Sequence, residues 1–392
     1  MRVLSMIAVL AVALGLVIVT PASGAVQVTV VASGFDSPRG VAVSGGDVLV
    51  GEAGHGGDVC IPNPIFGTNC IGLTSQISEV DPRTGSHHPL ISGLFSSLLG
   101  GTESLGVDGI AVRGDKVLAI FGEYPQQFAS INCAPPMPAD CAAVKAAALA
   151  QAGYLISVDH NGKSKALASV GAFDFDFTAE IPRQEHDSNP YGVLPTGEGA
   201  ALIADAGSNT LNLVTDDGMV SVVHYFHFEP PAGSFPSDAV PTCAVRAGGK
   251  LWVADLSGRL FRVEGGSATQ VTVADSNGNR LLHHVTGCSS APSEQSGDRE
   301  GDDSGGGVIY LVNMWTTPTF PSPNTGSVVR YDVSNGSATV VADKLNSPNM
   351  LAVASAHTLY VSANSVCPAG GGPPAECNFM GKTSGLLLKI SL

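Results

Sequence analysis

Six short stretches of the chain share one pattern, and this pattern decides the fold. In each, turn-forming or small residues lead to Gly or a substitute and then to a short apolar run. The stretches are SPRGVAV (37–43), GVDGIAV (106–112), NPYGVLP (189–195), VPTCAVR (240–246), HVTGCSS (284–290) and SPNMLAV (347–353). Each is followed by a turn and a second apolar stretch, such as DVLVGEA (47–53). Apolar alternation between Gly, Asp and Asn turns is typical of half-buried β-strands.

Third and fourth apolar stretches complete each unit, as in GRLFRVE (258–264) and TQVTVAD (269–275). Six units of four short strands predict an all-β, six-bladed β-propeller of the TolB-like or NHL-like kind, formed as one domain over residues 25–392. The last unit stops after its third strand, GLLLKISL (385–392). We expect the N-terminal stretch VQVTVVAS (26–33) to supply the missing strand and close the last blade.

The N-terminus predicts export. Arg2 precedes an apolar run over residues 3–19, and Pro21 and small residues follow it. This is the pattern of a signal peptide over residues 1–24, cleaved after Gly24 or Ala25. The alternative is an uncleaved membrane anchor, which Pro21 and the small residues disfavour. No other stretch is apolar enough to span a bilayer, so we expect a secreted, monomeric protein without further membrane association.

Composition narrows the class of partner. A net charge of −15 argues against binding to nucleic acid. Eight cysteines in an exported chain predict disulfides. Three pairs lie close in sequence: Cys60 with Cys70, Cys133 with Cys141, and Cys367 with Cys377. Cys243 and Cys288 either pair or remain buried thiols.

One face of the predicted propeller carries most of the long connections. In a four-stranded blade, the loop before the first strand and the loop between the second and third strands emerge on the same face, called the loop face below. Its insertions are residues 54–75, 124–152, 175–188, 228–239, 314–326 and 364–384, and they contain the three close cysteine pairs. Residues 137–153 predict a helix lying over this face as a lid or a rim. Long loops on a rigid scaffold often carry function, so we expect a site here, around the mouth of the central channel.

Two rings of polar residues are expected to converge on that mouth. The first precedes the innermost strands: Arg39, Asp108, Tyr191, Thr242, Thr286 and Asn349. The second ends the second strands: Glu52, Asp205, Asp255 and Asn313, with Glu123 and Asn364 slightly out of register. Carboxylates and amides from several blades could hold a hard cation or bind a polyol.

Structural roles compete with these assignments. Asp205 and Asp255 suit turns pinned by side chain to backbone hydrogen bonds, and Arg39 and Asp108 could neutralise each other. Asp187 and Tyr191 fit such roles least. The ligand-binding candidates are Arg39, Glu52, Asp108, Asp187, Asn189, Tyr191 and Asn313, and the metal-binding candidates are Glu52, Asn189, Asp205 and Asp255.

The sequence predicts no catalytic residues. It shows no Ser/His/Asp order, nucleophile elbow or zinc-protease motif. The Gly-rich stretch GEAGHGG (51–57) lies between strands and lacks the helix that a phosphate site needs.

Three stretches carry a family resemblance: GFDSPRGVAVSGGDVLVGEAGHGG (34–57), DSNPYGVL (187–194) with ALIADAGSNTL (201–211), and VPTCAV (240–245) with LWVADLSG (251–258). The chain resembles the ScyD/ScyE family of exported propeller proteins with NHL-like repeats. The resemblance implies the fold, export and six blades, but it brings no catalytic residues. Cys243 stands where Gly is usual, and Gly-Val-Asp-Gly at 106–109 replaces the expected Gly-Pro-His-Asp.

Two functions follow as hypotheses. The first is a binding or scaffold propeller for an extracytoplasmic small molecule or protein, which the absence of a catalytic set favours. The alternative is a metal-dependent hydrolase or lactonase resembling gluconolactonases. There a divalent cation, such as Ca²⁺, would be held by the metal-binding candidates, with Asp187 as the base.

Overall fold

A computed structural model describes residues 26–63, 67–197, 199–227, 238–291, 307–317, 322–367, 377 and 384–392. The predicted signal peptide lies outside these residues. Among the helices of the described part, none is long and apolar enough to cross a membrane.

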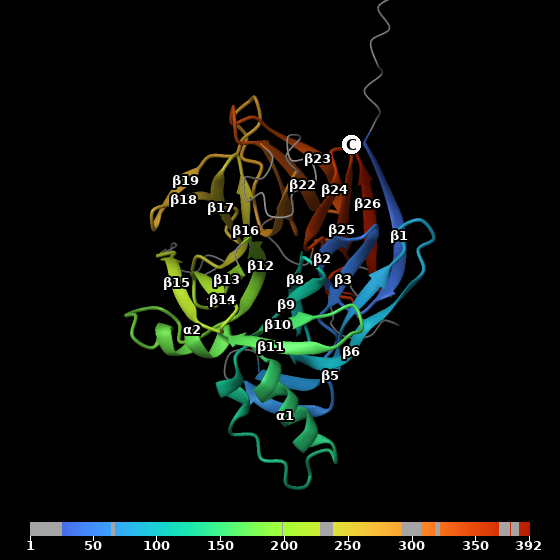
Figure 1. Cartoon of the computed structure of the whole chain (residues 1–392), viewed down its shortest axis with the longest axis vertical. Coiled ribbons are helices and arrows are strands. Elements are labelled where there is room, and N and C mark those ends of the chain that lie inside the picture. Colours follow the sequence, from blue (N-terminus) through green and yellow to red (C-terminus); the bar gives the residue numbers. More distant parts are fainter. Residues whose placement is uncertain are drawn as a thin grey trace, which may run out of the picture.

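The strands form six antiparallel sheets arranged as blades around one axis (Figure 1). Blade one contains β2 (Pro38–Ser44), β3 (Asp47–Glu52), β5 (Gly67–Val80), β6 (His87–Leu99) and β7 (Glu103–Leu105), with β4 (Val59–Asn63) paired to β5. Blade two contains β8 (Val107–Arg113), β9 (Lys116–Phe121), β10 (Tyr154–Val158) and β11 (Ser164–Ser169). Blade three contains β12 (Pro190–Thr196), β13 (Ala200–Asp205), β14 (Thr210–Thr215) and β15 (Val220–Tyr225).

The remaining blades repeat this order. Blade four contains β16 (Pro241–Ala247), β17 (Lys250–Asp255), β18 (Leu260–Glu264) and β19 (Ser267–Val271). Blade five contains β20 (Val285–Ser290), β21 (Val308–Asn313), β22 (Gly326–Asp332) and β23 (Ala338–Leu345). Blade six contains β24 (Leu351–Ser355), β25 (Thr358–Ala363), β26 (Gly385–Ser391) and β1 (Gln27–Phe35). The predicted six-bladed propeller is confirmed.

The N-terminal strand closes the ring, as predicted. β1 runs antiparallel to β26, from the pair Gln27 and Ser391 to the pair Phe35 and Gly385. Apolar side chains then pack across the junction, with Val48 of blade one and Leu387 of blade six in one buried cluster. The N-terminal strand is therefore built into the last blade by a hydrogen-bonded ladder, and the first and last blades share an apolar core.

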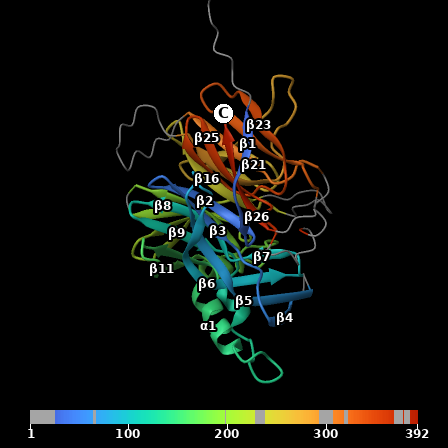
Figure 2. The same ribbon diagram turned by 90° about the vertical axis from the view of Figure 1, so that its right-hand side faces the viewer.

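One local prediction was wrong. Much of residues 54–75 is strand rather than loop, because β4 and the long β5 extend blade one well beyond four strands, to one side of the molecule (Figure 2).

The predicted helix is present but shorter, as α1 (Cys141–Gln151), and packs beside η1 (Pro125–Phe128), β5 and β6 at the outer rim of the propeller (Figure 1). Its buried Val144 and Ala148 join the core of blades one and two. Of the two positions expected for this helix, a lid or a rim, α1 therefore has the rim.

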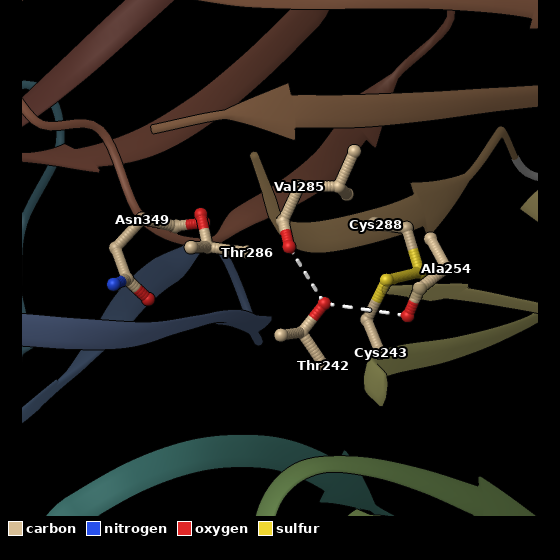
Figure 3. The surroundings of a disulfide bond; sticks show 7 residues. All are labelled: Thr242, Cys243, Ala254, Val285, Thr286, Cys288 and Asn349. Atoms are coloured by element: carbon tan, nitrogen blue, oxygen red, sulfur yellow. Dashed lines mark hydrogen bonds between the residues drawn. A yellow bond between two sulfur atoms is a disulfide. The ribbon is translucent and has the colours of Figure 1, made fainter. Parts of the chain in front are cut away.

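All eight cysteines form disulfides. The three close pairs are present as predicted, and Cys243 pairs with Cys288. This fourth bond joins β16 to β20, the innermost strands of two neighbouring blades (Figure 3). Beside it, the Thr242 hydroxyl donates to the Val285 carbonyl at 2.8 Å. Disulfides of this number are consistent with an oxidising, extracytoplasmic compartment.

Removing the Cys243–Cys288 bond should weaken the ring. The bond spans 45 residues, and a loop of that size gives a stabilisation of about 4 kcal/mol in the chain-entropy account. We expect Cys243→Ala with Cys288→Ala to lower the free energy of unfolding by about that amount in urea denaturation. The control is Cys133→Ala with Cys141→Ala, a bond that spans only 8 residues beside α1. Equal losses in both double variants would contradict a special role for the bond between blades.

Candidate functional site

A β-bulge at the start of the innermost strands creates the first ring. The pairing register shifts at this point in β2, β8, β12, β16 and β20, each against the second strand of its blade. The bulged positions are Arg39, Asp108, Tyr191, Thr242 and Thr286, while Asn349 lies just before β24. A bulge re-aims a side chain away from the ladder. The structure thus brings these six predicted residues together, and all six are buried.

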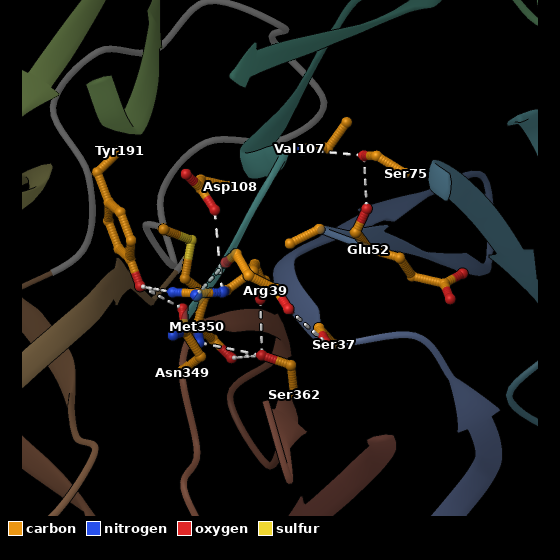
Figure 4. A network of polar contacts seen from close by, with 12 residues as sticks. Ser37, Arg39, Glu52, Ser75, Val107, Asp108, Tyr191, Asn349, Met350 and Ser362 are labelled. Carbon is orange, nitrogen blue, oxygen red and sulfur yellow. Dashed lines mark hydrogen bonds and ion pairs between the residues drawn. The ribbon is translucent and has the colours of Figure 1, made fainter. Parts of the chain in front are cut away.

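The first ring bridges the axis (Figure 4). Arg39 of blade one donates from Nη1 to the Tyr191 hydroxyl of blade three at 3.3 Å. Tyr191 donates in turn to Oδ1 of Asn349 in blade six at 2.8 Å. Arg39 and Tyr191 are only 4% and 6% exposed. Hydrogen bonds among these three buried residues therefore link three blades at the axis.

Asp108 completes this axial network with Arg39. Its Oδ1 lies 3.8 Å from Arg39 Nε, and both side chains are buried. Burial raises the pKa of Asp108 to about 8, although the charge of Arg39 acts in the opposite direction. Because both side chains are buried 3.8 Å apart, contact with each other is favoured over the ligand role expected for this pair.

Three residues of the second ring accept a hydrogen bond from the loop that enters their own blade. Glu52 accepts from the Asp36 N–H at 2.7 Å, and Asn313 accepts from the His283 N–H at 2.9 Å. Asp205 accepts from the Asn189 N–H at 2.8 Å. In all three cases the acceptor ends a second strand and the donor precedes the first strand of the same blade. This repeated hydrogen bond stabilises the conformation of the loop face.

Asp205 and Asp255 have the turn-pinning role considered for them. Oδ1 of Asp205 also accepts from the N–H groups of Gly207 and Ser208, at 2.9 and 3.0 Å. Asp255 is held by Arg259, which donates from its backbone N–H at 2.9 Å and from Nε at 2.7 Å. These bonds occupy oxygens that a cation would need.

The four metal-binding candidates do not share a site. Among the described residues, no group of three or more His, Cys, Asp or Glu side chains is placed to hold one ion. Asn189, the fourth candidate, accepts from the Glu123 N–H through Oδ1 at 3.2 Å. Glu52, Asp205 and Asp255 thus each form hydrogen bonds within their own blade.

A buried carboxyl pair was missed by the sequence analysis. Asp174 on α2 (Val170–Thr178) accepts from Asn212 Nδ2 at 2.6 Å and from the Thr210 hydroxyl at 3.1 Å. Burial raises the pKa of Asp174 to about 9, and the neighbouring charge of Asp205 raises it further. Asp174 therefore keeps its proton at neutral pH. An entry loop was predicted at residues 175–188 and no helix here, so Asp174 was not identified from the sequence.

Aromatic and titratable side chains that are at least partly exposed lie together on the loop face over blades two and three. Tyr124 stacks on Phe175 with 4.4 Å between ring centroids, and Phe175 stacks on His186 at 3.6 Å. Asp187 lies nearby, since its charge helps to raise the pKa of Tyr124 to about 12 after the larger effect of burial. Burial raises the pKa of Asp187 itself to about 7. Within the described residues, no side chain donates a hydrogen bond to its carboxylate, unlike that of Asp205.

Comparison with known proteins supports the fold. No protein-family model and no curated protein matches the chain. A structural-genomics protein of unknown function from Bacteroides thetaiotaomicron is 10% identical, covers 94% of this chain and 76% of its own, and has a TM-score of 0.54. A gluconolactonase from Xanthomonas campestris is 9% identical, with 94% and 90% covered and a TM-score of 0.50. A luciferin-regenerating enzyme is 9% identical, with 94% and 95% covered and a TM-score of 0.50.

The fold thus defines the class: a six-bladed β-propeller, similar in architecture to the gluconolactonase from Xanthomonas campestris. At such low identity the likeness extends to the fold alone.

The carboxyl pair predicts a pH-dependent stability. In the folded protein Asp174 keeps its proton at pH values where the unfolded chain has lost it, so stability falls as pH rises from 3.8 toward about 9. Asp174→Asn imitates the protonated form. We expect it to raise the Tm by about 2 °C or more at pH 8 and to change it little at pH 4.

The matched control is Asp176→Asn, an exposed position on the same helix. Thermal melts of the three proteins at several pH values make the comparison. A Tm difference between Asp174→Asn and the unmodified protein that stays constant from pH 4 to pH 8 would contradict a protonated Asp174 in the folded state.

Proposed function

We propose that this protein is a secreted binding propeller of the ScyD/ScyE type, whose ligand is a small polar molecule held on the loop face over blades two and three. The observation that carries the proposal is Asp187. It is a predicted ligand-binding carboxylate on the loop face to which no described side chain donates a hydrogen bond. Asp108 also accepts no hydrogen bond from a described side chain, but it is fully buried beside Arg39 at the axis. Keeping a half-buried carboxylate ionised costs free energy, which a ligand can offset by donating hydrogen bonds.

The surroundings of Asp187 suit such a ligand. Tyr124, Phe175 and His186 offer stacked ring surfaces from three separate segments of the chain. Apolar ring faces beside one ionised oxygen group favour a ligand with an apolar body and a hydroxyl or amino group. The net charge of −15 disfavours an anion.

The metal-dependent hydrolase receives less support. Its candidate ligands Asp205 and Asp255 are engaged by backbone amides and by Arg259. A divalent cation such as Ca²⁺ bound elsewhere on the propeller stays a prediction. Elemental analysis of the purified mature protein, with thermal melts in the presence and absence of EDTA, tests it directly. About one equivalent of metal and a melt lowered by EDTA would restore the hydrolase hypothesis.

Asp187 should matter for binding and not for folding. We expect a thermal-shift screen of polyols, amines and hydroxylated aromatic compounds to find a ligand, and Asp187→Asn to weaken its binding at least tenfold in calorimetry, or about 1.4 kcal/mol. The Tm of the free variant should not fall, because the raised pKa of Asp187 already disfavours its charged form in the folded state.

Glu185→Gln, an exposed acid in the same loop, is the matched control and should bind normally. A ligand whose affinity is the same for Asp187→Asn and for the unmodified protein would place the binding surface elsewhere.

A further inference from the structure

A histidine–aspartate pair lies on the loop face of blade one, apart from the site over blades two and three. Nδ1 of His55 is 2.7 Å from Oδ2 of Asp36. The Asp36 side chain is 11% exposed, whereas that of His55 is 48% exposed. A carboxylate on Nδ1 fixes the tautomer with the proton on that nitrogen, so Nε2 carries the lone pair. Within the described residues, no other side chain bonds to the imidazole.

The backbone around His55 is fixed by glycines. Gly54 and Gly56 flank it with φ of +80° and +69°, and a Cβ on Gly54 would lie 2.5 Å from Oγ1 of Thr74. The His55 N–H donates to that same Thr74 oxygen at 3.0 Å, and the Gly56 N–H donates to the Ser96 hydroxyl at 2.9 Å. The loop is therefore clamped onto β5 and β6, and the position of the imidazole is set before any ligand arrives.

Hydrogen bonds also fix the position of Asp36, the carboxylate partner of His55. The Asp36 N–H donates to Oε2 of Glu52 at 2.7 Å, and the Asp36 carbonyl accepts from the Gly54 N–H at 3.1 Å. Oε1 of Glu52 is bound in turn by Gln76 at 2.8 Å and by the Ser78 hydroxyl at 2.5 Å. Glu52, a predicted ligand contact, thus acts as a positioning residue for Asp36. Two segments distant in sequence converge to orient one imidazole, as preorganised catalytic groups require.

We propose that His55 and Asp36 form a metal-independent acid–base pair that hydrolyses a small ester or lactone on the loop face. Nε2 of His55 takes a proton from water while the water oxygen bonds to the carbonyl carbon. The ester C–O bond then breaks, and the imidazolium returns its proton to the leaving alkoxide, which yields a carboxylic acid and an alcohol. Water and one oriented base suffice for this reaction, and the half-exposed imidazole is accessible to both reactants. The proposal goes beyond ligand binding and does not depend on Asp187.

The test uses the purified mature protein with p-nitrophenyl acetate and with δ-valerolactone, from pH 5 to pH 9. We expect His55→Gln to lower the rate about 100-fold, the contribution typical of a general base. Asp36→Asn should lower the rate and also move the midpoint of the pH profile downward. The reason is that the hydrogen bond that His55 donates to Asp36 raises the pKa of His55 more than burial lowers it. The carboxylates that face His55 are Asp36 and, behind it, Glu52.

The matched control is His88→Gln. That histidine is 71% exposed and lies 3.8 Å from Glu79, so it also has a carboxylate neighbour but is not oriented by a buried one. Its loss should leave the rate unchanged. Thermal melts of each variant detect a merely structural role, in which His55→Gln would lower the Tm without changing the rate. A wild-type rate no higher than that of the same concentration of free imidazole, or a His55→Gln rate equal to wild type, would overturn the proposal.

Discussion

The six innermost strands lie around one axis, and the limited space between them is the constraint on which the rest of the structure depends. The residue after the bulge lies against the backbone of the next blade, so that a Cβ on Gly287 would approach the Asn349 carbonyl to 2.7 Å. Glycine stands there in four blades, at Gly40, Gly109, Gly192 and Gly287. Met350 and Cys243 stand there in blades six and four, and Cys243 bonds to Cys288 on the adjoining strand. The position that is glycine in four blades thus carries a covalent link in blade four.

The polar residues fall into two groups according to their hydrogen-bond partners. Asp205 and Asn313 end second strands and are occupied by the backbone of their own blades. Asp187 and His55 lie farther out on the loop face, where the fold supports them but leaves part of their bonding capacity unused. Polar residues near the axis therefore stabilise the architecture, and the residues of both proposed sites lie on the loops.

The repeat was readable from sequence because each blade is a local unit with its own strand and turn signals. Closure by β1 and the three close disulfides followed from the same local pattern. The site was less predictable, because it depends on contacts between blades. Tyr191 was recognised as unusual, but its bond to Asn349 requires knowing that blades three and six face each other across the axis. His55 and Asp36 belong to separate segments, and only the conformation of the glycine loop brings them within 2.7 Å.

The closing pair of β1 and β26 also bears on the order in which the chain folds. Gln27 pairs with Ser391, so the strand that is made early waits for one of the last to be made. Contacts this distant in sequence form slowly and leave strand edges open in the meantime. A partly synthesised chain can build blades but cannot complete the circle. Closure of the propeller is therefore a late step of folding that requires the whole chain.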